Sequence, residues 1–170
     1  MKLADFFKYC PNCQSKLKKT DHFFCSKCDF YHYLNPFPSN ALILYNLKNE
    51  IVLVKRKYPP KKDYWDLPGG FINQDETVEQ SLKREIKEEL NLDIDIDKLK
   101  YLTSTFDQYF YKKINQKTIC FTFVYQIKDE VLKPTDDVSQ IKFFKKENIP
   151  WKKIGFKGIK IVLERFFTSF

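Results

Sequence analysis

Three glutamates, Glu85, Glu88 and Glu89, crowd one short stretch that has the pattern of a helix. Counted at about 100° per residue from Val78, the apolar residues of this stretch form a stripe from about 0° to 120°. Glu85 and Glu89 fall near the edge of that stripe, at about −20° and +20°, and Glu88 lies beside them at about −80°. An ordinary amphipathic helix avoids this, because burying an unpaired charge is costly and like charges one turn apart repel. We therefore expect a cation among these side chains.

The type of cation follows from the ligands. Converging carboxylates offer hard oxygen ligands, which suit Mg²⁺ or Mn²⁺ far better than zinc. The alternative interpretation is a solvated helix face with salt bridges, in which Arg84 pairs with Glu88 at i, i+4. The same angular count places Arg84 on the exposed face of the helix. From these residues alone, the metal site and the salt-bridged face both stay open.

The helix that carries the glutamates has clear signals at both ends. Thr77 followed by Gln80 has the pattern of a capping box, so we predict that the helix begins at Val78. We predict that it ends at Leu90, because Asn91 stands where a left-handed residue commonly closes a helix. These two ends fix the angular positions used above.

Four of the five cysteines form two Cys-x-x-Cys pairs, Cys10 with Cys13 and Cys25 with Cys28, separated by eleven residues. A short β-ribbon would bring the two pairs together around one tetrahedral zinc. Two disulfides or redox-active pairs are the alternatives, but disulfides do not persist in a reducing cytosol and neither pair follows a strand-to-helix pattern. Four thiolates leave zinc no open position, so we predict a structural role. Cys120, inside an apolar strand, is interpreted as a core residue.

The rest of the chain predicts strands followed by helices. Residues 31–40, rich in proline and asparagine, are interpreted as a linker, so we divide the chain into residues 1–34 and 35–170. Strand-like runs cover 41–47 and 50–57, joined as a hairpin at Lys48-Asn49, and also 98–111, 117–127 and 140–144. Residues 57–70 are interpreted as a loop because prolines and paired glycines interrupt them, and 156–167 as a closing helix.

Composition limits the partners and the compartment. The chain has 30 Lys and Arg against 22 Asp and Glu, and the resulting charge of +8 favours anionic partners such as phosphates or nucleic acid. MKLADFFKYC, the first ten residues, has no apolar stretch longer than two residues, so we expect no secretory signal there. The apolar run 118–127 is too short to span a bilayer. We expect a soluble cytoplasmic protein with no membrane partner, and we leave a homodimer open.

Residues 70–92 resemble a Nudix box, whose pattern is Gly, five residues, Glu, seven residues, then Arg-Glu-apolar-x-Glu-Glu-x-Gly-apolar. The matching positions are Gly70, Glu76, Arg84, Glu85, Ile86, Glu88, Glu89 and Leu92. Asn91 replaces the final Gly and leaves the acidic positions untouched. The preceding WDLPGGF is also Nudix-like. A zinc ribbon ahead of such a domain is similar to the arrangement in the NADH pyrophosphatase branch of the family.

This resemblance implies a Nudix-type α/β/α sandwich with a mixed β-sheet, preceded by a small zinc-ribbon module. It implies metal-dependent hydrolysis of a nucleoside diphosphate linked to another group, with water attacking phosphorus. The implied ligands of Mg²⁺ or Mn²⁺ are Glu85, Glu88, Glu89 and the carbonyl oxygen of Gly70.

The resemblance also implies roles beyond the metal ligands. Glu76 would orient Arg84, and Arg84 would brace Glu85. The general base would be Glu85 or an acidic residue from a later loop, for which Asp137 is the best candidate. The plainer interpretation of Asp137 is a turn aspartate that follows Pro134.

The substrate is less well defined by the sequence. We rank ADP-ribose or a nucleotide sugar first and a dinucleotide such as NADH second, because the NADH branch carries an array close to Ser-Gln-Pro-Trp-Pro-Phe-Pro after the box and this chain has none. Tyr64 and Trp65 are candidates to stack on the base. Phe106 and Tyr109 are further aromatic candidates, although in a chain this aromatic each is more readily explained as a core residue.

A different class of function also stays open. The charge of +8, the ribbon and the lysines at 16, 18, 19 and 27 are compatible with a nucleic-acid-binding protein or with an enzyme that acts on RNA 5′ ends. Basic charge is a generic feature and carries no specificity by itself.

Overall fold

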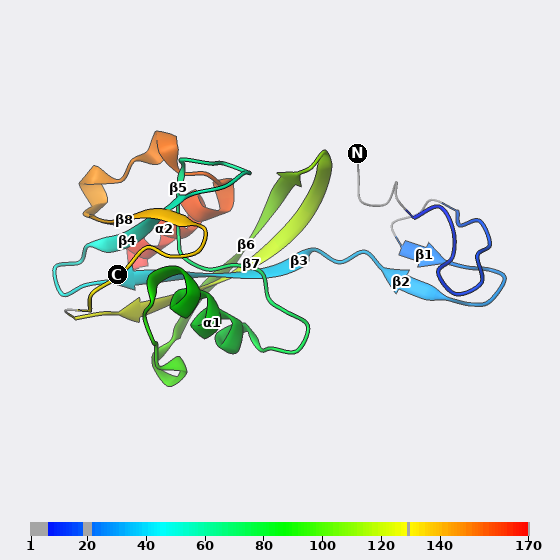
Figure 1. Ribbon diagram of the computed structural model, residues 1–170, viewed down its shortest axis with the longest axis horizontal. Coiled ribbons are helices and arrows are strands. Elements are labelled where there is room, and N and C mark those ends of the chain that lie inside the picture. The colour runs from blue at the N-terminus through cyan, green and yellow to red at the C-terminus, as the bar shows by residue number, and fades with distance from the viewer. Residues whose placement is uncertain (1–6, 19–21, 129, 170) are drawn as a thin grey trace.

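The computed structural model describes residues 7–18, 22–128 and 130–169. Figure 1 shows a small ribbon joined to a larger domain built on one sheet. In the ribbon, β1 (His22–Phe24) pairs antiparallel with β2 (Tyr31–Tyr33). That residues 1–34 form an independent unit stays a prediction. Within the described part of the chain, no helix is long and apolar enough to cross a membrane.

The larger domain contains a six-stranded mixed sheet. Its strands are β3 (Phe37–Tyr45), β4 (Ile51–Arg56), β5 (Trp65–Asp66), β6 (Lys100–Tyr111), β7 (Ile114–Gln126) and β8 (Val138–Phe144). The order is β5-β4-β3-β7-β6, and β8 pairs with β4. Only β3 and β7 run parallel; the other pairs are antiparallel.

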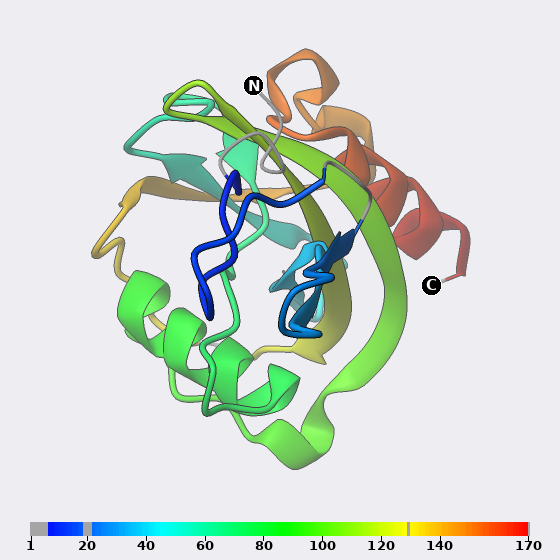
Figure 2. The same cartoon turned by 90° about the vertical axis from the view of Figure 1, so that its right-hand side faces the viewer.

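Two helices cover opposite faces of this sheet, α1 (Val78–Leu90) and α2 (Lys157–Ser169), as Figure 2 shows. Strand β3 supplies both cores because successive side chains point to opposite faces. Leu42 and Leu44 pack in the core beneath α1, whereas Ile43 packs in the core beneath α2. In the described residues, three short 3₁₀ helices lie in the connections: Ile96–Lys98, Lys146–Asn148 and Trp151–Lys153. The predicted α/β/α sandwich is therefore confirmed.

Two predicted boundaries differ from the structure. The segment 31–40, interpreted as a linker because of its prolines and asparagines, contains β2 and the start of β3. The connection between the ribbon and the larger domain is therefore only residues 34–36. Pro38 is tolerated in β3 because it stands near the start of the strand, where one ladder donor can be lost. The predicted loop 57–70 contains the two-residue strand β5, which pairs with Val54 and Lys55.

The predicted hairpin is present, but its two strands pair only where they meet. The turn is closed by Asn46, whose Oδ1 accepts hydrogen bonds from the backbone N–H groups of Lys48 and Glu50. The strands pair at Tyr45 and Ile51 and then separate, β3 toward β7 and β4 toward β8 and β5.

Candidate active site

The ends of α1 are fixed as the sequence predicts. The Gln80 N–H donates to Thr77 Oγ1 at 3.2 Å, and the Thr77 N–H donates to Gln80 Oε1 at 2.9 Å, which completes the capping box. Asn91 closes the helix in the left-handed conformation, with φ of 53°. The helix therefore begins and ends at the predicted residues, and Leu82, Ile86 and Leu90 are buried as expected.

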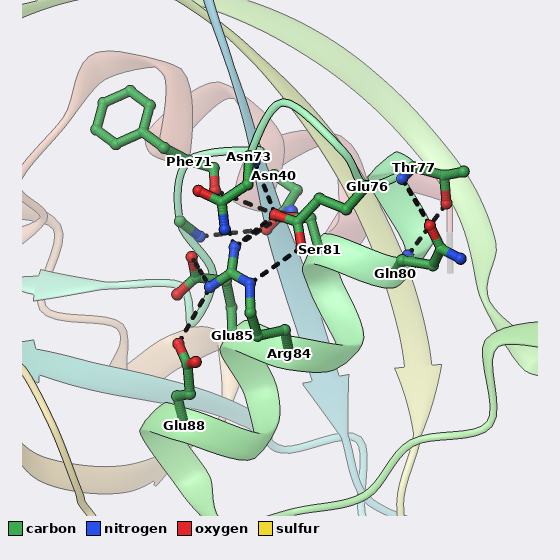
Figure 3. Close-up of polar contacts among 11 residues, drawn as sticks. Asn40, Phe71, Asn73, Glu76, Thr77, Gln80, Ser81, Arg84, Glu85 and Glu88 are labelled. Carbon is green, nitrogen blue, oxygen red and sulfur yellow. Dashed lines mark hydrogen bonds and ion pairs between the residues drawn. The ribbon is translucent and has the colours of Figure 1, made fainter.

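Arg84 is the centre of a network of acidic side chains (Figure 3). Its Nε and Nη2 donate to the two carboxylate oxygens of Glu76, at 3.0 and 2.6 Å. Its Nη1 donates to Glu85 Oε1 at 2.8 Å and to Glu88 Oε2 at 3.1 Å. The pairing with Arg84 lowers the pKa of Glu76 to about 2. The contacts that the Nudix resemblance implied for Glu76 and Glu85 are therefore present, together with the i, i+4 pair between Arg84 and Glu88.

The prediction that Arg84 lies on the exposed face is wrong. The angular count describes where the Cα–Cβ bond points, but a long side chain can bend back along the helix surface. Arg84 bends toward the loop before the helix, where Nη2 also donates to the carbonyl oxygen of Phe71 at 3.2 Å. The guanidinium thus ties the loop to the helix.

Glu89 is the most deeply placed acidic group of the helix. Its side chain is 5% exposed, and Oε2 accepts a hydrogen bond from the Gly69 N–H at 2.9 Å. Burial raises the pKa of Glu89 well above its usual value, and the nearby Asp137 adds to that rise. Burial also raises the pKa of Glu85, although its contact with Arg84 opposes the rise. A raised pKa means that the ionised form of the carboxylate is disfavoured at this position, and a bound cation would stabilise that form.

Asp137 reaches this position because its loop is bonded to the end of α1. The Thr135 N–H donates to the Glu89 carbonyl at 3.0 Å, and the Lys133 N–H donates to the Leu90 carbonyl at 3.1 Å. The Thr135 hydroxyl also donates to the Glu88 carbonyl. These contacts carry the chain past the helix terminus, so that Asp137 lies next to Glu89.

The two glycines before the box are held against β3. The Gly70 carbonyl accepts from the Asn40 N–H at 2.8 Å, and the Gly70 N–H donates to Asn40 Oδ1 at 3.2 Å. A Cβ at Gly70 would overlap the Glu85 carboxylate, so any side chain at this position would displace that carboxylate. A carbonyl oxygen has two acceptor sites, and the bond from Asn40 leaves one for a metal ion.

The donor set fits a hard divalent cation. Glu85 and Glu89 present carboxylates on the side of the helix that faces Gly70, and each has a raised pKa. Glu88 is turned to Arg84 instead. In the described part of the chain, the four cysteines form the one group of three or more metal-binding side chains whose ligand atoms all lie within 4.8 Å of one another. A closed cage of glutamates is therefore not part of this arrangement.

A cavity of about 160 Å³ lies beside these carboxylates. Its lining residues include Gly69, Gly70 and Asp137. The residues that line the rest are Ser39, Asn40, Ala41, Arg56, Asp66, Leu67, Phe71, Thr105, Asp107, Tyr109, Thr118, Cys120, Phe156 and Ile159. A whole small-molecule site usually measures about 300–1,000 Å³, so this cavity holds only part of a nucleotide-sized ligand.

Three aromatic rings form one wall of the cavity. Tyr109 stacks on Phe156, with ring centroids 5.8 Å apart, and meets the edge of Phe71 at 5.4 Å. Tyr64 and Trp65, the predicted stacking residues, do not line the cavity. Trp65 packs on Phe144 instead, at 5.1 Å. The sequence pattern could not distinguish the rings that line the cavity from those that pack in the core, because the three wall rings come from segments that lie far apart in the chain.

The sequence interpretation missed an ion pair inside the cavity. Arg56 Nη1 donates to Asp66 Oδ2 at 3.1 Å, and Arg56 Nε donates to the Pro60 carbonyl at 2.8 Å. The guanidinium carbon lies 5.3 Å from the centre of the Phe156 ring. Burial raises the pKa of Asp66 to about 6, partly offset by Arg56. An Arg that ends an apolar strand-like run is a signal for such a pair, but its partner cannot be read from the sequence.

The four cysteines of the ribbon converge as predicted. Cys13 Sγ lies 3.5 Å from Cys25 Sγ and Cys10 Sγ lies 3.7 Å from Cys28 Sγ, and all four sulfurs lie within 4.8 Å of one another. Tetrahedral zinc with Zn–S bonds of about 2.3 Å sets sulfurs about 3.8 Å apart. All four cysteines are free thiols, which excludes the disulfide alternative in this structure. The geometry fits one zinc with four sulfur ligands.

Comparisons with known proteins agree with this geometry. The family model described as NUDIX domain matches residues 36–166. An ADP-ribose pyrophosphatase from Methanocaldococcus jannaschii is 37% identical over 114 residues, which cover 67% of this chain and 64% of that protein. An NAD-capped RNA hydrolase NudC from Pseudomonas aeruginosa is 27% identical over 100 residues, which cover 57% of this chain and 34% of that protein. These matches therefore span less than two thirds of either relative.

A solved structure extends the likeness over nearly the whole chain. The crystal structure of a NUDIX hydrolase from Nitrosomonas europaea superposes with a TM-score of 0.67 at 27% identity, covering 95% of this chain and 91% of that one. A NUDIX domain of NrtR from Shewanella oneidensis, solved with ADP ribose, gives a TM-score of 0.67 at 16% identity, over 86% of this chain and 93% of that one. At that identity the second likeness concerns the fold alone.

Proposed function

Because this chain belongs to the NUDIX domain family, we propose that it is a metal-dependent pyrophosphohydrolase that cleaves a nucleoside diphosphate linked to another group, such as ADP-ribose or a nucleotide sugar. One observation carries the proposal: the aromatic wall lines the same cavity as Gly69 and Asp137, and these two residues contact the buried Glu89 of α1. Gly69, Gly70 and Asp137 would form its reacting part, and the stacked rings of Tyr109 and Phe156 line the same cavity. A diphosphate with a base attached has this distribution of charge and aromatic surface.

The proposed metal ligands are the glutamates of the helix and one carbonyl. Glu85, Glu88, Glu89 and the Gly70 carbonyl would hold Mg²⁺ or Mn²⁺, which when bound stabilises charge on the phosphates and lowers the pKa of a bound water. Arg84 holds the Glu85 carboxylate, and Glu76 fixes Arg84 by two hydrogen bonds. Glu85 remains the first candidate for the general base.

Asp137 is the second candidate, as a base or as a further ligand. Its placement beside the buried Glu89 supports a role in the reacting part, because both side chains border the same glycine loop. A turn aspartate with no role would be expected to face solvent. We rank Glu85 above Asp137 as the general base because Arg84 donates a hydrogen bond to Glu85, whereas no hydrogen bond between Arg84 and Asp137 is found among the described residues.

The chain's own cationic group in the cavity is Arg56. Its Nε and one Nη1 donor are used by Pro60 and Asp66, so the remaining guanidinium donors can bind a phosphate oxygen. Asn40 offers a second donor: its Nδ2 is buried and has no hydrogen-bond partner among the described residues. An unpaired buried donor is costly, so a substrate that accepts from it gains affinity. Tyr109 and Phe156 would hold the base by stacking.

We also propose that Cys10, Cys13, Cys25 and Cys28 hold one structural zinc. Four thiolates fill a tetrahedral site and leave no position for substrate. The zinc would therefore hold the ribbon together without taking part in hydrolysis.

A hydrolysis screen that detects the two phosphorylated products by chromatography tests the proposed activity. The purified full chain is incubated with Mg²⁺ or Mn²⁺ and with ADP-ribose, nucleotide sugars, NADH, nucleoside triphosphates or 5′-capped RNA. We expect ADP-ribose or a nucleotide sugar to have the highest kcat/KM, and Tyr109→Ala to raise KM for it. Preference for NADH or for capped RNA would replace the proposed substrate, and no hydrolysis of any compound with either metal would refute the proposed reaction.

A further inference from the structure

Two lysines from distant parts of the chain converge on one tyrosine. Lys61 Nζ lies 5.4 Å and Lys153 Nζ lies 5.2 Å from the centre of the Tyr64 ring. An ammonium group over an aromatic ring is attracted by the negative charge of the ring face. The two ammonium groups also repel each other, because salt screens charges only over about 8–10 Å. Tyr64 therefore keeps two positive charges close together, and an anion that contacts both would relieve their repulsion. We call these three residues the lysine cluster.

The lysine cluster is tied to Arg56, which lines the cavity. The Arg56 N–H donates to the Tyr64 carbonyl at 2.9 Å. Arg56 Nε donates to the carbonyl of Pro60, the residue before Lys61, at 2.8 Å. The Tyr64 N–H donates to the Lys61 carbonyl at 3.1 Å, which closes the turn between them. The turn that carries Lys61 and Tyr64 is therefore held directly beside a cavity residue.

The segment that carries Lys153 is tied to a second cavity residue. A Cβ added at Gly155 would lie 3.4 Å from Lys61 Cβ and 3.5 Å from Tyr64 Cβ, so the two segments are in contact. Phe156 follows Gly155 in the chain and lines the cavity. The lysine cluster therefore lies beside the part of the aromatic wall that Phe156 forms.

The two segments have an excess of positive charge. Residues 57–64 and 150–157 contain six lysines and one acidic residue, Asp63. All six lysines are exposed, and none forms an ion pair with another described residue. A local excess of one sign attracts ligands of the opposite charge, so this surface favours an anion. The six are Lys57, Lys61, Lys62, Lys152, Lys153 and Lys157.

The ribbon lysines have no comparable support. Among the described residues, none of Lys16, Lys18 and Lys27 lies over an aromatic ring. Lys19, which the sequence interpretation grouped with them, lies outside the described residues. These contacts favour the lysine cluster over the ribbon as the place where an anion binds.

The size of the cavity indicates which part of a ligand reaches the lysine cluster. At about 160 Å³ the cavity holds only part of a nucleotide, so the remainder lies outside it. In the proposed function, Phe156 stacks on the base of the substrate. The ribose is bonded to the base, and its 2′ and 3′ oxygens stay free when the 5′ oxygen carries the diphosphate. A substituent on either oxygen would therefore extend from the cavity beside Phe156.

Charge indicates what that substituent is. A phosphate monoester has a charge of about −1.5 to −2 at pH 7, which matches two ammonium groups, whereas a hydroxyl has none. We propose that Lys61 and Lys153 bind a phosphate monoester on the 2′ or 3′ oxygen of the substrate's nucleoside, and that Tyr64 positions the two lysines. This inference rests on the proposed function for the position of the base. It defines the substrate class more closely, as a nucleoside diphosphate derivative whose ribose carries a further phosphate.

The test measures binding and does not require hydrolysis. Isothermal titration calorimetry of the purified full chain, without added Mg²⁺ or Mn²⁺, compares AMP with adenosine 2′,5′-bisphosphate and adenosine 3′,5′-bisphosphate. None of the three contains a diphosphate bond, so none is consumed during the measurement. We expect one of the bisphosphates to bind about tenfold more tightly than AMP, for two exposed charge contacts. Added salt should reduce this advantage, because screening weakens exposed pairs.

Variants of the two lysines show whether they hold the added phosphate. Gln removes the charge of a lysine but keeps most of its length, so Lys61→Gln and Lys153→Gln should each reduce the advantage of the bisphosphate about threefold. The double Gln variant should bind the bisphosphate and AMP with nearly equal Kd. The double Arg variant should keep the advantage, because a guanidinium keeps the charge and also binds aromatic faces.

Lys142→Gln is the matched control. Lys142 Nζ also lies over an aromatic ring, 5.2 Å from the centre of Phe144, but Lys142 stands on β8 opposite Leu53 and does not line the cavity. This variant removes the same charge from the chain, so it should keep the advantage of the bisphosphate over AMP.

Several outcomes would overturn the proposal. Equal Kd values for AMP and both bisphosphates, or no binding of any of them, would refute it. An advantage that persists in the double Gln variant would assign the added phosphate to another group. Tighter binding of the dinucleotide pApA, whose 3′ oxygen carries a phosphodiester, than of either bisphosphate would assign the cluster to an RNA chain instead. Hydrolysis in the screen without a bisphosphate advantage would refute this inference alone, whereas a bisphosphate advantage without hydrolysis would refute the proposed activity alone.

Discussion

Replacing Glu89 with Gln separates the metal site from a merely charged helix face. In the wild type the Gly69 N–H donates to Glu89 Oε2 at 2.9 Å. The amide oxygen of Gln can accept the same hydrogen bond, and its NH₂ group can donate to Asp137. The buried charge is removed without leaving a cavity or an unpaired acceptor. In EDTA we expect the variant to unfold with a free energy at least equal to that of the wild type.

The pH dependence of this difference follows from the raised pKa of Glu89. A carboxyl whose pKa is higher in the folded state than in the unfolded state costs stability once pH rises above its unfolded value, about 4.5. The cost grows by up to about 1.4 kcal/mol per pH unit until pH reaches the folded pKa. In urea unfolding with EDTA, the free energy of unfolding of the variant should therefore increase relative to that of the wild type as pH rises above about 4.5.

Divalent metal should reverse the order. A metal at a hundredfold excess over its Kd stabilises the wild type by about 2.7 kcal/mol, which for a chain of this size raises Tm by roughly 5–10 °C. Glu89→Gln removes one anionic ligand, so the Tm shift with Mg²⁺ or Mn²⁺ should be smaller. Turnover should fall at least a hundredfold, which corresponds to about 2.7 kcal/mol of lost transition-state stabilisation. Glu88→Gln should lower turnover similarly, with little effect on stability in EDTA.

Glu79→Gln is the matched control on the same helix. Glu79 stands in the first turn, away from Gly69, and its replacement should cost only the fraction of a kcal/mol expected from a first-turn charge. Wild-type turnover and a wild-type metal shift in Glu89→Gln would refute the metal interpretation. So would equal losses of turnover in Glu79→Gln and Glu89→Gln.

Three further predictions concern the ribbon, the glycine loop and Glu76. Elemental analysis of freshly purified protein should find one zinc per chain, and zinc should be lost in Cys25→Ser; a chain without zinc would contradict the proposed site. Gly69→Ala should lower the free energy of unfolding in urea by about 3 kcal/mol or more, because at φ of 136° its Cβ would lie 2.5 Å from the Asn40 carbonyl oxygen. The control Gly155→Ala, whose Cβ would lie 3.4 Å from its nearest neighbour, should change it by less than about 1 kcal/mol. Similar losses at both positions would show that the close approach at Gly69 has no special cost. The stability that the ion pair of Glu76 with Arg84 contributes should be complete above the unfolded pKa of 4.5 and disappear as pH falls to about 2. The free energies of unfolding of the wild type and of Glu76→Gln should therefore converge at about pH 2. A difference between them that does not change with pH would show that the charge of Glu76 contributes nothing.

Local signals explain what the sequence could predict. The capping box of Thr77 and Gln80 and the left-handed Asn91 depend on neighbours within four residues, so the bounds of α1 follow from the sequence and are confirmed. The long strands β6 and β7 are rich in β-branched and aromatic residues and were predicted for the same reason. The cysteine spacing predicted convergence because a tetrahedral site restricts which turns can supply its ligands.

The cavity could not be predicted, because it depends on pairs that are distant in the chain. Phe71 and Tyr109 meet only because β6 folds over the loop before α1, and Phe156 joins them from the start of α2. Asp66 is a loop residue in the sequence and becomes buried only because β5 pairs with β4. No periodic pattern distinguishes these aromatics from Trp65, which packs in the core.

The two interpretations that the sequence left open for the helix glutamates turn out to be compatible. Arg84 pairs with Glu88 through one contact to a half-exposed carboxylate, and such surface pairs contribute only about 0–1 kcal/mol. The same guanidinium keeps two hydrogen bonds to Glu76, so it stays in place when Glu88 turns away. A cation that binds Glu85 and Glu89 can therefore recruit Glu88 at small cost. The salt-bridged face and the proposed metal site would then be two arrangements of one set of side chains, and Arg84 would permit both.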